Sequence, residues 1–312
     1  MTTAGARAGG VAIVVLTMNQ REKTLRCLAS VREVRGDLFD VVLWDNNSGD
    51  GTVQAVADSF PEVLVHQHET NLGVASGRNA AARMAAEQFG SAYFLFLDND
   101  TTVDPEFLRH LLSPFASDPC VAQTTPKIKF YSDHRILYGA RGCGVNFLFG
   151  RTAHIGHREI DRGQYDARSN CIPSGGCMLV RRDVFERLNG FDSIYDPYGP
   201  EDLDFGFRVR EAGYAALYIP DAVIFHDPSP GRTVSQGQYS ETYASYRARH
   251  WLRFMRRHAS PLQQAGFFII GAPYLLTRVL IREGRKGNFA AVKGLLRGGL
   301  DFWRSSAARK RP

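Results

Sequence analysis

The segment YFLFLDNDTTV, residues 93–103, decides how the rest of the chain is interpreted. Its apolar residues predict a buried strand, and two aspartates, Asp98 and Asp100, follow at the carboxyl end of that strand. Carboxylates in such a place need a positive partner, because burying an unpaired charge costs free energy. A divalent metal such as Mg²⁺ or Mn²⁺ meets that need, since both prefer oxygen ligands. The other interpretation is a polar turn, for which Asp-Asn-Asp-Thr is good chemistry. The segment alone does not separate the two.

Strands and helices alternate on the amino-terminal side of this segment. Alternation over short connections predicts an α/β fold with a mostly parallel, doubly wound central sheet. In such sheets ligands bind beyond the carboxyl ends of the strands. Thr17, Asn19, Asp45 and the aspartate pair all lie at such ends, which favours a shared site over several separate turns. The predicted strands are residues 11–17, 39–45, 63–67 and 93–98. The first predicted helix ends near residue 31, and two further helices are predicted at residues 52–60 and 74–89.

The second half of the chain has less regular patterning at its start. Residues 126–172 contain many Gly and Arg and predict either hairpins or a mobile loop. Regular elements then return, with a helix from about Arg182, a helix that starts near Glu201, and a strand at 215–226. We therefore predict these parts: disorder at 1–10, one α/β domain at 11–235 with halves 11–125 and 126–235, and a basic helical appendage at 236–312.

Length and composition are those of a globular protein. The 312 residues suffice for one large α/β domain with an appendage, and 44% hydrophobic and 22% charged residues are ordinary values. The five cysteines form no CxxC pair, and without a signal peptide they indicate reduced thiols in a cytoplasmic protein. Zinc binding by Cys171 and Cys177 is discounted, because no further ligands lie near them in the sequence.

The net charge of +6 is concentrated near the carboxyl terminus, where ten Lys or Arg follow residue 277 against Glu283 and Asp301. Such a tail indicates an anionic partner, and the lack of a nucleic-acid-binding module favours lipid over nucleic acid. An apolar stretch of about twelve residues, 265–276, precedes most of this charge and contains Pro273. Because spanning a bilayer takes about twenty residues, we expect this stretch to dip into a membrane interface. The alternative is a helix packed on the α/β domain or on a second copy of the chain in a homo-oligomer.

Four segments, in order, resemble the family-2 glycosyltransferases of the GT-A fold: VVLTMNQREKTLRCLASV (14–31), VVLWDNNSGDGT (41–52), NLGVASGRNAAAR (71–83) and FLFLDND (94–100). Residues 174–214 resemble the acceptor-side half of these enzymes, so the resemblance covers about residues 11–226. It implies inverting transfer of a sugar from a UDP- or dTDP-linked donor to a hydroxyl of a saccharide or polyprenyl-diphosphate-linked acceptor. Similar enzymes are bacterial rhamnosyl- and hexosyltransferases of cell-envelope saccharide synthesis, which suggests a peripheral protein on the cytoplasmic face of the membrane.

The resemblance also implies how the donor is held. Asp45 would read the base, since a carboxylate accepts the N3–H of uracil or thymine; an Asx-turn is the alternative. Arg78, near the start of a helix, would meet the diphosphate together with backbone N–H groups; a solvated helix charge is the alternative. Thr17 and Asn19 would line the same site, and Asp98 would reach the ribose or the metal.

The remaining implied roles concern metal and catalysis. Asp98 and Asp100 correspond to the DXD motif that binds Mn²⁺ or Mg²⁺ in this family, with His226 as a further ligand or as a structural histidine. Asp202 corresponds to the base that deprotonates the acceptor hydroxyl, and Glu201 would hold the acceptor. Acidic residues also favour a helix start for structural reasons alone.

Two other functions are consistent with part of the pattern. A haloacid-dehalogenase-type phosphatase also carries an apolar strand followed by DxDxT, here Asp98, Asp100 and Thr102, with Asp202 and Asp204 as a second acidic pair. Such enzymes place the motif on the first strand, whereas three predicted strands precede it here. The other alternative is a nucleotide-sugar-binding protein without catalytic activity.

Overall fold

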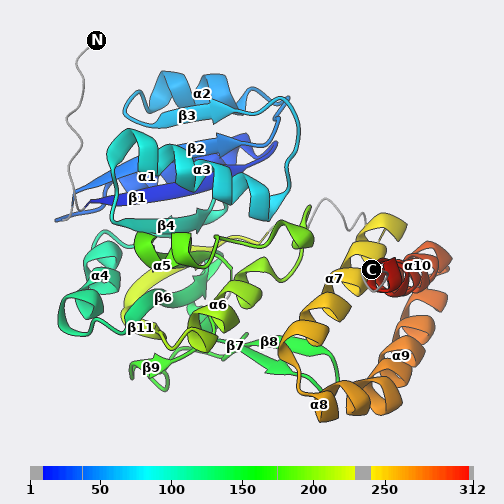
Figure 1. The fold of residues 1–312 in the computed structure, drawn as a ribbon. Coiled ribbons are helices and arrows are strands. Elements are labelled where there is room, and N and C mark those ends of the chain that lie inside the picture. Colours follow the sequence, from blue (N-terminus) through cyan, green and yellow to red (C-terminus); the bar gives the residue numbers. More distant parts are fainter. Residues whose placement is uncertain (1–9, 37, 174, 229–239, 309–312) are drawn as a thin grey trace. The chain divides into compact units, whose positions relative to one another are not determined.

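The structure is a computed structural model that describes residues 10–36, 38–173, 175–228 and 240–308 (Figure 1). The predicted disorder at residues 1–10 falls, except for Gly10, outside the described residues. The chain forms two compact units. The first contains the residues up to Cys143, His154–Pro197 and Glu201–Asp227, and the second contains Gly144–Ala153, Tyr198–Pro200 and the residues from Pro228 onward.

A mostly parallel sheet forms the centre of the first unit, with strand order β3-β2-β1-β4-β10-β6-β11-β5. Strands β1, β2, β3 and β4 pair in parallel, as do β6 and β11, whereas β10 runs antiparallel between β4 and β6. The predicted sheet class is therefore confirmed. The strands are β1 (Val11–Thr17), β2 (Phe39–Asp45), β3 (Leu64–Gln67), β4 (Tyr93–Asp98), β5 (Thr101–Val103), β6 (Val121–Phe130), β7 (Asp133–Asn146), β8 (Arg151–Ile155), β9 (Ser169–Asn170), β10 (Cys177–Arg181) and β11 (Ala215–His226).

Helices cover both faces of this sheet, which is why the strands have continuous apolar sequences. Ile13 and Val15 of β1 face one helical layer, and Ala12 and Val14 face the other. Each fully buried Val or Ile stabilises the fold by roughly 1.5–3 kcal/mol. The first layer is α1 (Arg21–Arg32), α2 (Thr52–Ser59) and α4 (Phe107–Ser117), and the second is α3 (Val74–Phe89), α5 (Arg182–Arg187) and α6 (Glu201–Glu211).

Residues 126–172 contain hairpin strands, which was one of the two predicted alternatives. β7 pairs with β6 and with β8. The segment after β8 is tied back to the sheet by Lys127 of β6, whose buried ammonium group contacts the carboxylates of Asp161, at 3.1 Å, and Asp166. Both carboxylates hold the pKa of Lys127 above its usual value against the opposing effect of burial.

The second unit is helical, as predicted for the basic appendage, but it also includes the loop between β7 and β8. Its helices are α7 (Glu241–His258), α8 (Pro261–Gly266), the π-helical turn η3 (Phe267–Gly271), α9 (Ala272–Gly284) and α10 (Phe289–Ala308). The domain boundary predicted near residue 236 falls among residues that the structure does not describe, and it stays a prediction.

The apolar segment forms a longer helix than the sequence predicted. α8, η3 and α9 follow one another without a break, giving a 24-residue helix from Pro261 to Gly284, and the mean hydropathy of its most apolar 18-residue window is 1.4. By length and composition alone this helix could cross a membrane, so the prediction that the segment is too short was wrong. Pro273 does not end the helix, because it lies at the first turn after η3, where the hydrogen-bond register already changes.

Candidate active site

Asp98, Asp100 and His226 lie together at the carboxyl ends of β4 and β11. The pairing of β5 with β11, which sets Thr101 opposite His226, brings the histidine to the aspartates. One ligand atom from each residue lies within 4.8 Å of the others, and His226 Nε2 is 3.1 Å from Asp100 Oδ1. The second ring nitrogen, Nδ1, is buried and has no hydrogen-bond partner among the described residues. Two carboxylates and one imidazole form a donor set that suits Mn²⁺ or Mg²⁺.

The metal and turn interpretations of residues 98–101 do not exclude each other. The hydroxyl of Thr101 donates to the carbonyl oxygen of Asp98 at 2.7 Å, which is turn geometry. The turn orients the backbone and leaves the carboxylates free to gather with His226. Burial opposes protonation of His226, but its hydrogen bond to Asp100 and the charges of both aspartates hold its pKa above the usual value.

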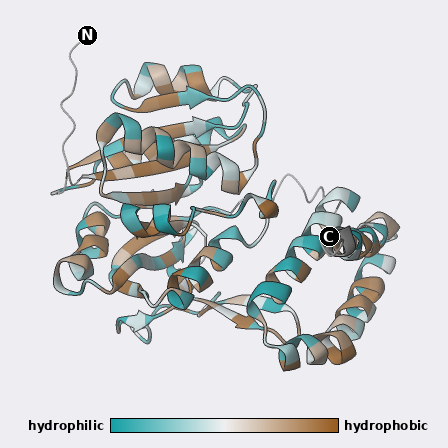
Figure 2. Cartoon of the chain, in the orientation of Figure 1, coloured by the Kyte–Doolittle hydropathy of each residue, from teal (hydrophilic) through white to brown (hydrophobic). Residues whose placement is uncertain are grey.

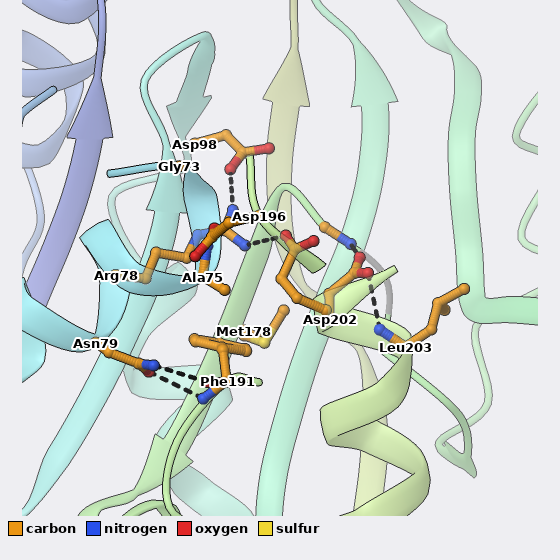
Figure 3. Close-up of polar contacts among 12 residues, drawn as sticks. Gly73, Ala75, Arg78, Asn79, Asp98, Met178, Phe191, Asp196, Asp202 and Leu203 are labelled. Carbon is orange, nitrogen blue, oxygen red and sulfur yellow. Dashed lines mark hydrogen bonds and ion pairs between the residues drawn. The ribbon is translucent and has the colours of Figure 1, made fainter. Parts of the chain in front are cut away.

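Arg78 is a buried cation that joins two parts of the site (Figure 3). Its guanidinium is 2.6 Å from Asp98 Oδ1 and 3.2 Å from Glu201 Oε1, and the residue is only 7% exposed. The alternative of a solvated helix charge is therefore wrong. Although burial disfavours its charge, the carboxylates of Asp98, Glu201 and Asp202 hold the pKa of Arg78 above its usual value.

The amino terminus of α3 differs from the prediction. We expected its backbone N–H groups to be available to a diphosphate, but they bond to Asp196. Asp196 accepts from the backbone of Ala75 at 2.9 Å and of Ser76 at 3.2 Å, and from the Ser76 hydroxyl at 2.5 Å. The carboxylate comes so close that a Cβ on Gly73, whose φ is +90°, would lie 2.4 Å from its oxygen. A protein carboxylate thus occupies the anion site of this helix.

Glu201 and Asp202 begin α6, as predicted, and face Arg78. Asp202 accepts from the backbone N–H groups of Leu203, at 2.7 Å, and of Gly175. Burial is the main cause that raises the pKa of both carboxyls, and for Glu201 the charge of Asp202 raises the pKa further, to about 8. Because the two N–H groups stabilise the ionised form of Asp202, we assign the retained proton to Glu201. The pair then consists of one carboxylate and one neutral acid.

The side chains of the three residues predicted at the ends of β1 and β2 all make hydrogen bonds to nearby protein groups. Asp45 is fully buried; one oxygen accepts from the backbone of Ser48 at 2.7 Å, and the other has no hydrogen-bond partner among the described residues. Asn19 bonds the same loop, since its Oδ1 accepts from Gly49. The hydroxyl of Thr17 points into a buried network with Thr24 and Asn99, so this side chain is occupied by protein contacts.

Several residues that surround this site were not indicated by any pattern in the sequence. Tyr138 of β7 packs edge-on against His226, with ring centroids 4.4 Å apart, and also against His154 and His157. Burial raises the pKa of Tyr138, and the charges of Asp98, Asp100 and Asp202 raise it further, which places the phenol within electrostatic reach of all three. Asp227, next to His226, pairs with Arg26 of α1 at 2.5 Å. These contacts join segments that lie far apart in the sequence, and Tyr138 belongs to the stretch whose structure could not be predicted.

A mostly parallel α/β sheet with two neighbouring acidic clusters defines the class of this protein, and comparison with known sequences assigns its family. Residues 12–188 match the family described as Glycosyl transferase family 2, and residues 155–225 match the N-terminal domain of galactosyltransferase. The chain belongs to glycosyl transferase family 2 and is a glycosyltransferase.

Curated relatives carry names from saccharide synthesis. The chain is 26% identical over 309 residues to the N-acetylglucosaminyl-diphospho-decaprenol L-rhamnosyltransferase of Mycobacterium tuberculosis, a match that covers 90% of this chain and 97% of the relative. It is also 26% identical to the O-antigen biosynthesis protein RfbC of Myxococcus xanthus, over 77% of this chain and 19% of that protein.

Solved structures confirm the GT-A fold. GalNAc-T7 with UDP, GalNAc and Mn²⁺ matches 80% of this chain and 48% of its own, with a TM-score of 0.64 and 16% identity. The mannosyltransferase of Pyrobaculum calidifontis with GDP-Man and Mn²⁺ matches 95% of this chain and 88% of its own, with a TM-score of 0.57 and 18% identity.

Proposed function

We propose that the protein is a metal-dependent inverting glycosyltransferase that moves a sugar from a UDP- or dTDP-linked donor to an acceptor hydroxyl. The observation that carries this proposal is the pair of clusters joined by Arg78: Asp98, Asp100 and His226 on one side, and Glu201 with Asp202 on the other. Asp98, Asp100 and His226 would hold the metal, which would offset negative charge on the departing nucleoside diphosphate.

The acidic pair on α6 supplies the chemistry of the acceptor side. Asp202 is the general base: ionised and held by two backbone N–H groups, it removes the proton of the attacking hydroxyl. Glu201, as the neutral acid of the pair, donates a hydrogen bond to the acceptor. A single base that activates the attacking hydroxyl is consistent with one displacement and inversion at the anomeric carbon. Arg78 contacts the Glu201 carboxyl at 3.2 Å, and its charge favours the ionised form of Asp202.

Asp45 is the residue that would select the base of the donor. Its second carboxylate oxygen is buried without a partner among the described residues, and a buried acceptor of this kind gains from an N–H donor. Uracil and thymine offer N3–H at the required edge, whereas cytosine has no such donor. This supports a UDP- or dTDP-linked sugar.

For the acceptor we propose a saccharide linked to a polyprenyl diphosphate. The support is the relative from Mycobacterium tuberculosis, whose name specifies a decaprenol-diphosphate-linked acceptor and which matches over nearly its whole length. Such an acceptor is held in a membrane, so the enzyme would act at its cytoplasmic face.

The phosphatase alternative and the non-catalytic alternative both fail. The family assignment is to glycosyltransferases. In addition, Asp204, which the phosphatase interpretation pairs with Asp202, is fully buried and bonded to Arg208 at 2.7 Å and to the hydroxyl of Tyr195. It cannot serve as a ligand or catalytic acid at the site.

Replacement of Asp202 by Asn tests the assignment of the base. We expect turnover to fall by roughly two to four orders of magnitude, which is the usual contribution of a general base, while the affinity for the donor changes little. Glu201→Gln keeps a neutral hydrogen-bonding group and should retain more activity. Steady-state kinetics with separate titration of the nucleoside diphosphate measures both effects. Normal turnover of Asp202→Asn beside an inactive Glu201→Gln would show that the roles are reversed.

A thermal-shift series with UDP, dTDP and GDP, each with and without Mn²⁺, tests the donor and the metal. A ligand at 100 times its Kd stabilises the folded state by about 2.7 kcal/mol. We expect UDP or dTDP with Mn²⁺ to give the largest shift in Tm. Asp100→Ala should lose this shift. Without ligand, its Tm should change no more than that of the exposed control variant Asp58→Ala. An undiminished Mn²⁺-dependent shift in Asp100→Ala would remove the metal site.

A further inference from the structure

The second unit exposes most of the large hydrophobic side chains on the described part of the protein. Of the 18 that are exposed, 12 lie between Leu262 and Trp303. Figure 2 shows the same concentration as brown segments in the helices of this unit. In the most apolar 18-residue window of the helix Pro261–Gly284 only 11% of the residues are buried, and Ile269 is 75% exposed. Large exposed apolar patches of this kind are typical of surfaces that bind a membrane, another protein or a ligand.

The exposed residues come from the helix Pro261–Gly284 and from α10, and we name them together the apolar face. On α10, Phe289, Leu296, Leu300 and Trp303 are exposed at helical spacing. The opposite side of α10 packs tightly on α7, because a Cβ on Gly298 would lie 2.1 Å from a carbonyl oxygen of that helix. The ring of Trp303 is 5.8 Å from that of Phe268, which connects α10 with η3. The apolar face consists of Leu262, Phe268, Ile269, Ile270, Tyr274, Leu276, Leu280, Ile281, Phe289, Leu296, Leu300 and Trp303.

Positive charge accompanies the apolar face. Residues 261–308 contain seven Lys or Arg against Glu283 and Asp301, a balance of +5 within a chain whose total is +6. Arg278 and Arg304 are exposed on the same helices. An apolar surface edged by basic residues matches a bilayer with negative headgroups, because apolar side chains can pack among the acyl chains while basic side chains pair with the headgroups. A second copy of this chain would instead bring two surfaces of equal positive charge together.

The packing inside the unit distinguishes lying in the membrane from crossing it. At about 1.5 Å per residue the helix Pro261–Gly284 is about 36 Å long, enough to span a hydrocarbon core of about 30 Å. However, Phe267 on its inner side packs against Met255 and Ala259 of the α7 region, with Trp251 beside them. α7 is strongly basic, so a spanning arrangement would have to draw its charged side chains into the hydrocarbon, at roughly 2.5–3.5 kcal/mol each.

From these observations we propose that the apolar face binds an anionic bilayer, with helix Pro261–Gly284 and α10 lying in the plane of the interface. This inference concerns the second unit and does not depend on the reaction that the first unit performs. It commits the surface to lipid and not to a second copy of the chain.

Flotation of the full-length protein with vesicles tests the proposal. We expect flotation with equal parts of phosphatidylglycerol and phosphatidylcholine at low salt, and at least a several-fold smaller floated fraction with phosphatidylcholine alone or at high salt. Ile269→Ser/Ile270→Ser and Leu296→Ser/Leu300→Ser should each reduce partitioning roughly ten-fold, because each removes two apolar side chains from the membrane. Leu38→Ser/Ile160→Ser, at exposed sites of the first unit, is the matched control and should float like the unaltered protein.

The basic residues have their own pair of variants. Arg278→Glu/Arg304→Glu should reduce binding to anionic vesicles and leave the weaker binding to phosphatidylcholine unchanged. Arg83→Glu/Arg109→Glu changes the net charge equally on exposed sites of the first unit and should have a clearly smaller effect. Equal effects of the two pairs would show that only net charge matters, which would overturn the assigned surface. Unchanged nucleotide-dependent thermal shifts confirm that every variant is folded.

Fluorescence reports the depth of the helices. The chain has three tryptophans, of which Trp303 is 57% exposed and Trp44 is buried. Trp303 should shift to shorter wavelength on anionic vesicles and be quenched most by lipids brominated close to the headgroup. Tyr274→Trp in a Trp303→Phe background places a probe near the middle of helix Pro261–Gly284, where shallow quenching is again expected. Strongest quenching at the bilayer centre would overturn the in-plane arrangement in favour of a spanning helix.

Light scattering without vesicles separates lipid from a second copy. If the unaltered protein is a dimer, the Ser variants are monomers and flotation is the same for all of them, the apolar face is a dimer interface and the proposal is wrong. Failure of the unaltered protein to float at low salt also overturns it. Neither result affects the proposed glycosyl transfer, which is measured with a soluble acceptor.

Discussion

At the scale of single residues, the distribution of charge in the site depends on one buried cation. Arg78 forms ion pairs with Asp98 and Glu201, and the charge of Asp202 also acts on its guanidinium. One positive charge does not offset the three neighbouring carboxylates, so a proton remains on Glu201, which is the most buried of the three and has the poorest hydrogen bonding to its ionised form. The hydrogen-bonded Asp202 is then available to accept a proton, which is what a base must do.

This assignment predicts a pH-dependent contribution to stability. Burial and the charge of Asp202 raise the pKa of Glu201 from 4.5 to about 8 in the folded protein. The folded state therefore keeps a proton that the unfolded chain loses, so the stabilising contribution is complete below pH 4.5 and is lost as the pH rises through about 8. The slope in that window is at most about 1.4 kcal/mol per pH unit.

Glu201→Gln should abolish this slope, because Gln resembles the protonated acid at every pH. Urea unfolding in EDTA between pH 5 and 9 measures the difference in unfolding free energy between variant and unaltered protein. We expect that difference to move in favour of Gln as the pH rises, with exposed Glu87→Gln as the control for the substitution itself. A difference that stays flat would mean that Glu201 is ionised throughout.

Individual residues could be predicted from the sequence where a local pattern carries them. Asp98 and Asp100 follow an apolar run, and Asp202 begins a helix after a Gly-Pro turn, so strand ends and helix starts indicated both. Residues that reach the site from distant segments of the chain follow no such local pattern. Tyr138 lies beside His226 because β7 pairs with β6 and β6 with β11, and that pairing depends on long-range packing.

At the scale of elements, α3 shows how a helix start can mislead. The sequence NLGVASGRN has the small residues and the basic residue of an anion-binding helix terminus, and the helix begins where expected. Its first-turn amides are nevertheless taken by Asp196, which lies 120 residues later in the chain next to a proline. Local sequence predicts the helix well, since propensity and periodicity are local, but it cannot show which anion the helix binds.

Asp196→Ala should therefore act on stability. It removes the acceptor of two backbone N–H groups and of the Ser76 hydroxyl, and loss of a helix cap costs about 1–2 kcal/mol. Asp196→Asn, which keeps one carbonyl oxygen, should lose less. Urea unfolding measures both variants against Asp58→Ala, and titration with the nucleoside diphosphate should show unchanged affinity. A large loss of affinity without loss of stability would instead show that the amino terminus of α3 takes part in binding the donor.

At the scale of the whole molecule, the chain crosses between its two units more often than the sequence suggested. We predicted a simple boundary near residue 236, yet the tip of the β7–β8 hairpin, Gly144–Ala153, and residues Tyr198–Pro200 group with the carboxyl-terminal helices. Changes in composition and charge did indicate the helical unit. They could not indicate these two insertions, since short loops that pack on a distant helix have no periodic pattern of their own.

The insertions predict what removal of the carboxyl-terminal helices does. In the second unit Phe147 packs on the cluster of Met255, Ala259 and Phe267, and the ring of Phe254 lies 6.1 Å away in a stacked arrangement. A chain that ends at Pro228 leaves Phe147 and Leu148 without these partners, so we expect it to associate through the β7–β8 loop. Light scattering should detect oligomers, and Phe147→Ser/Leu148→Ser in the same shortened chain should restore a monomer. The shortened chain should still give the Mn²⁺-dependent shift with UDP or dTDP, because Asp98, Asp100 and His226 all belong to the first unit. A shortened chain that is monomeric with its native loop would show that the insertion packs adequately without the helices, and the two units would then be separable at the boundary that the sequence predicted.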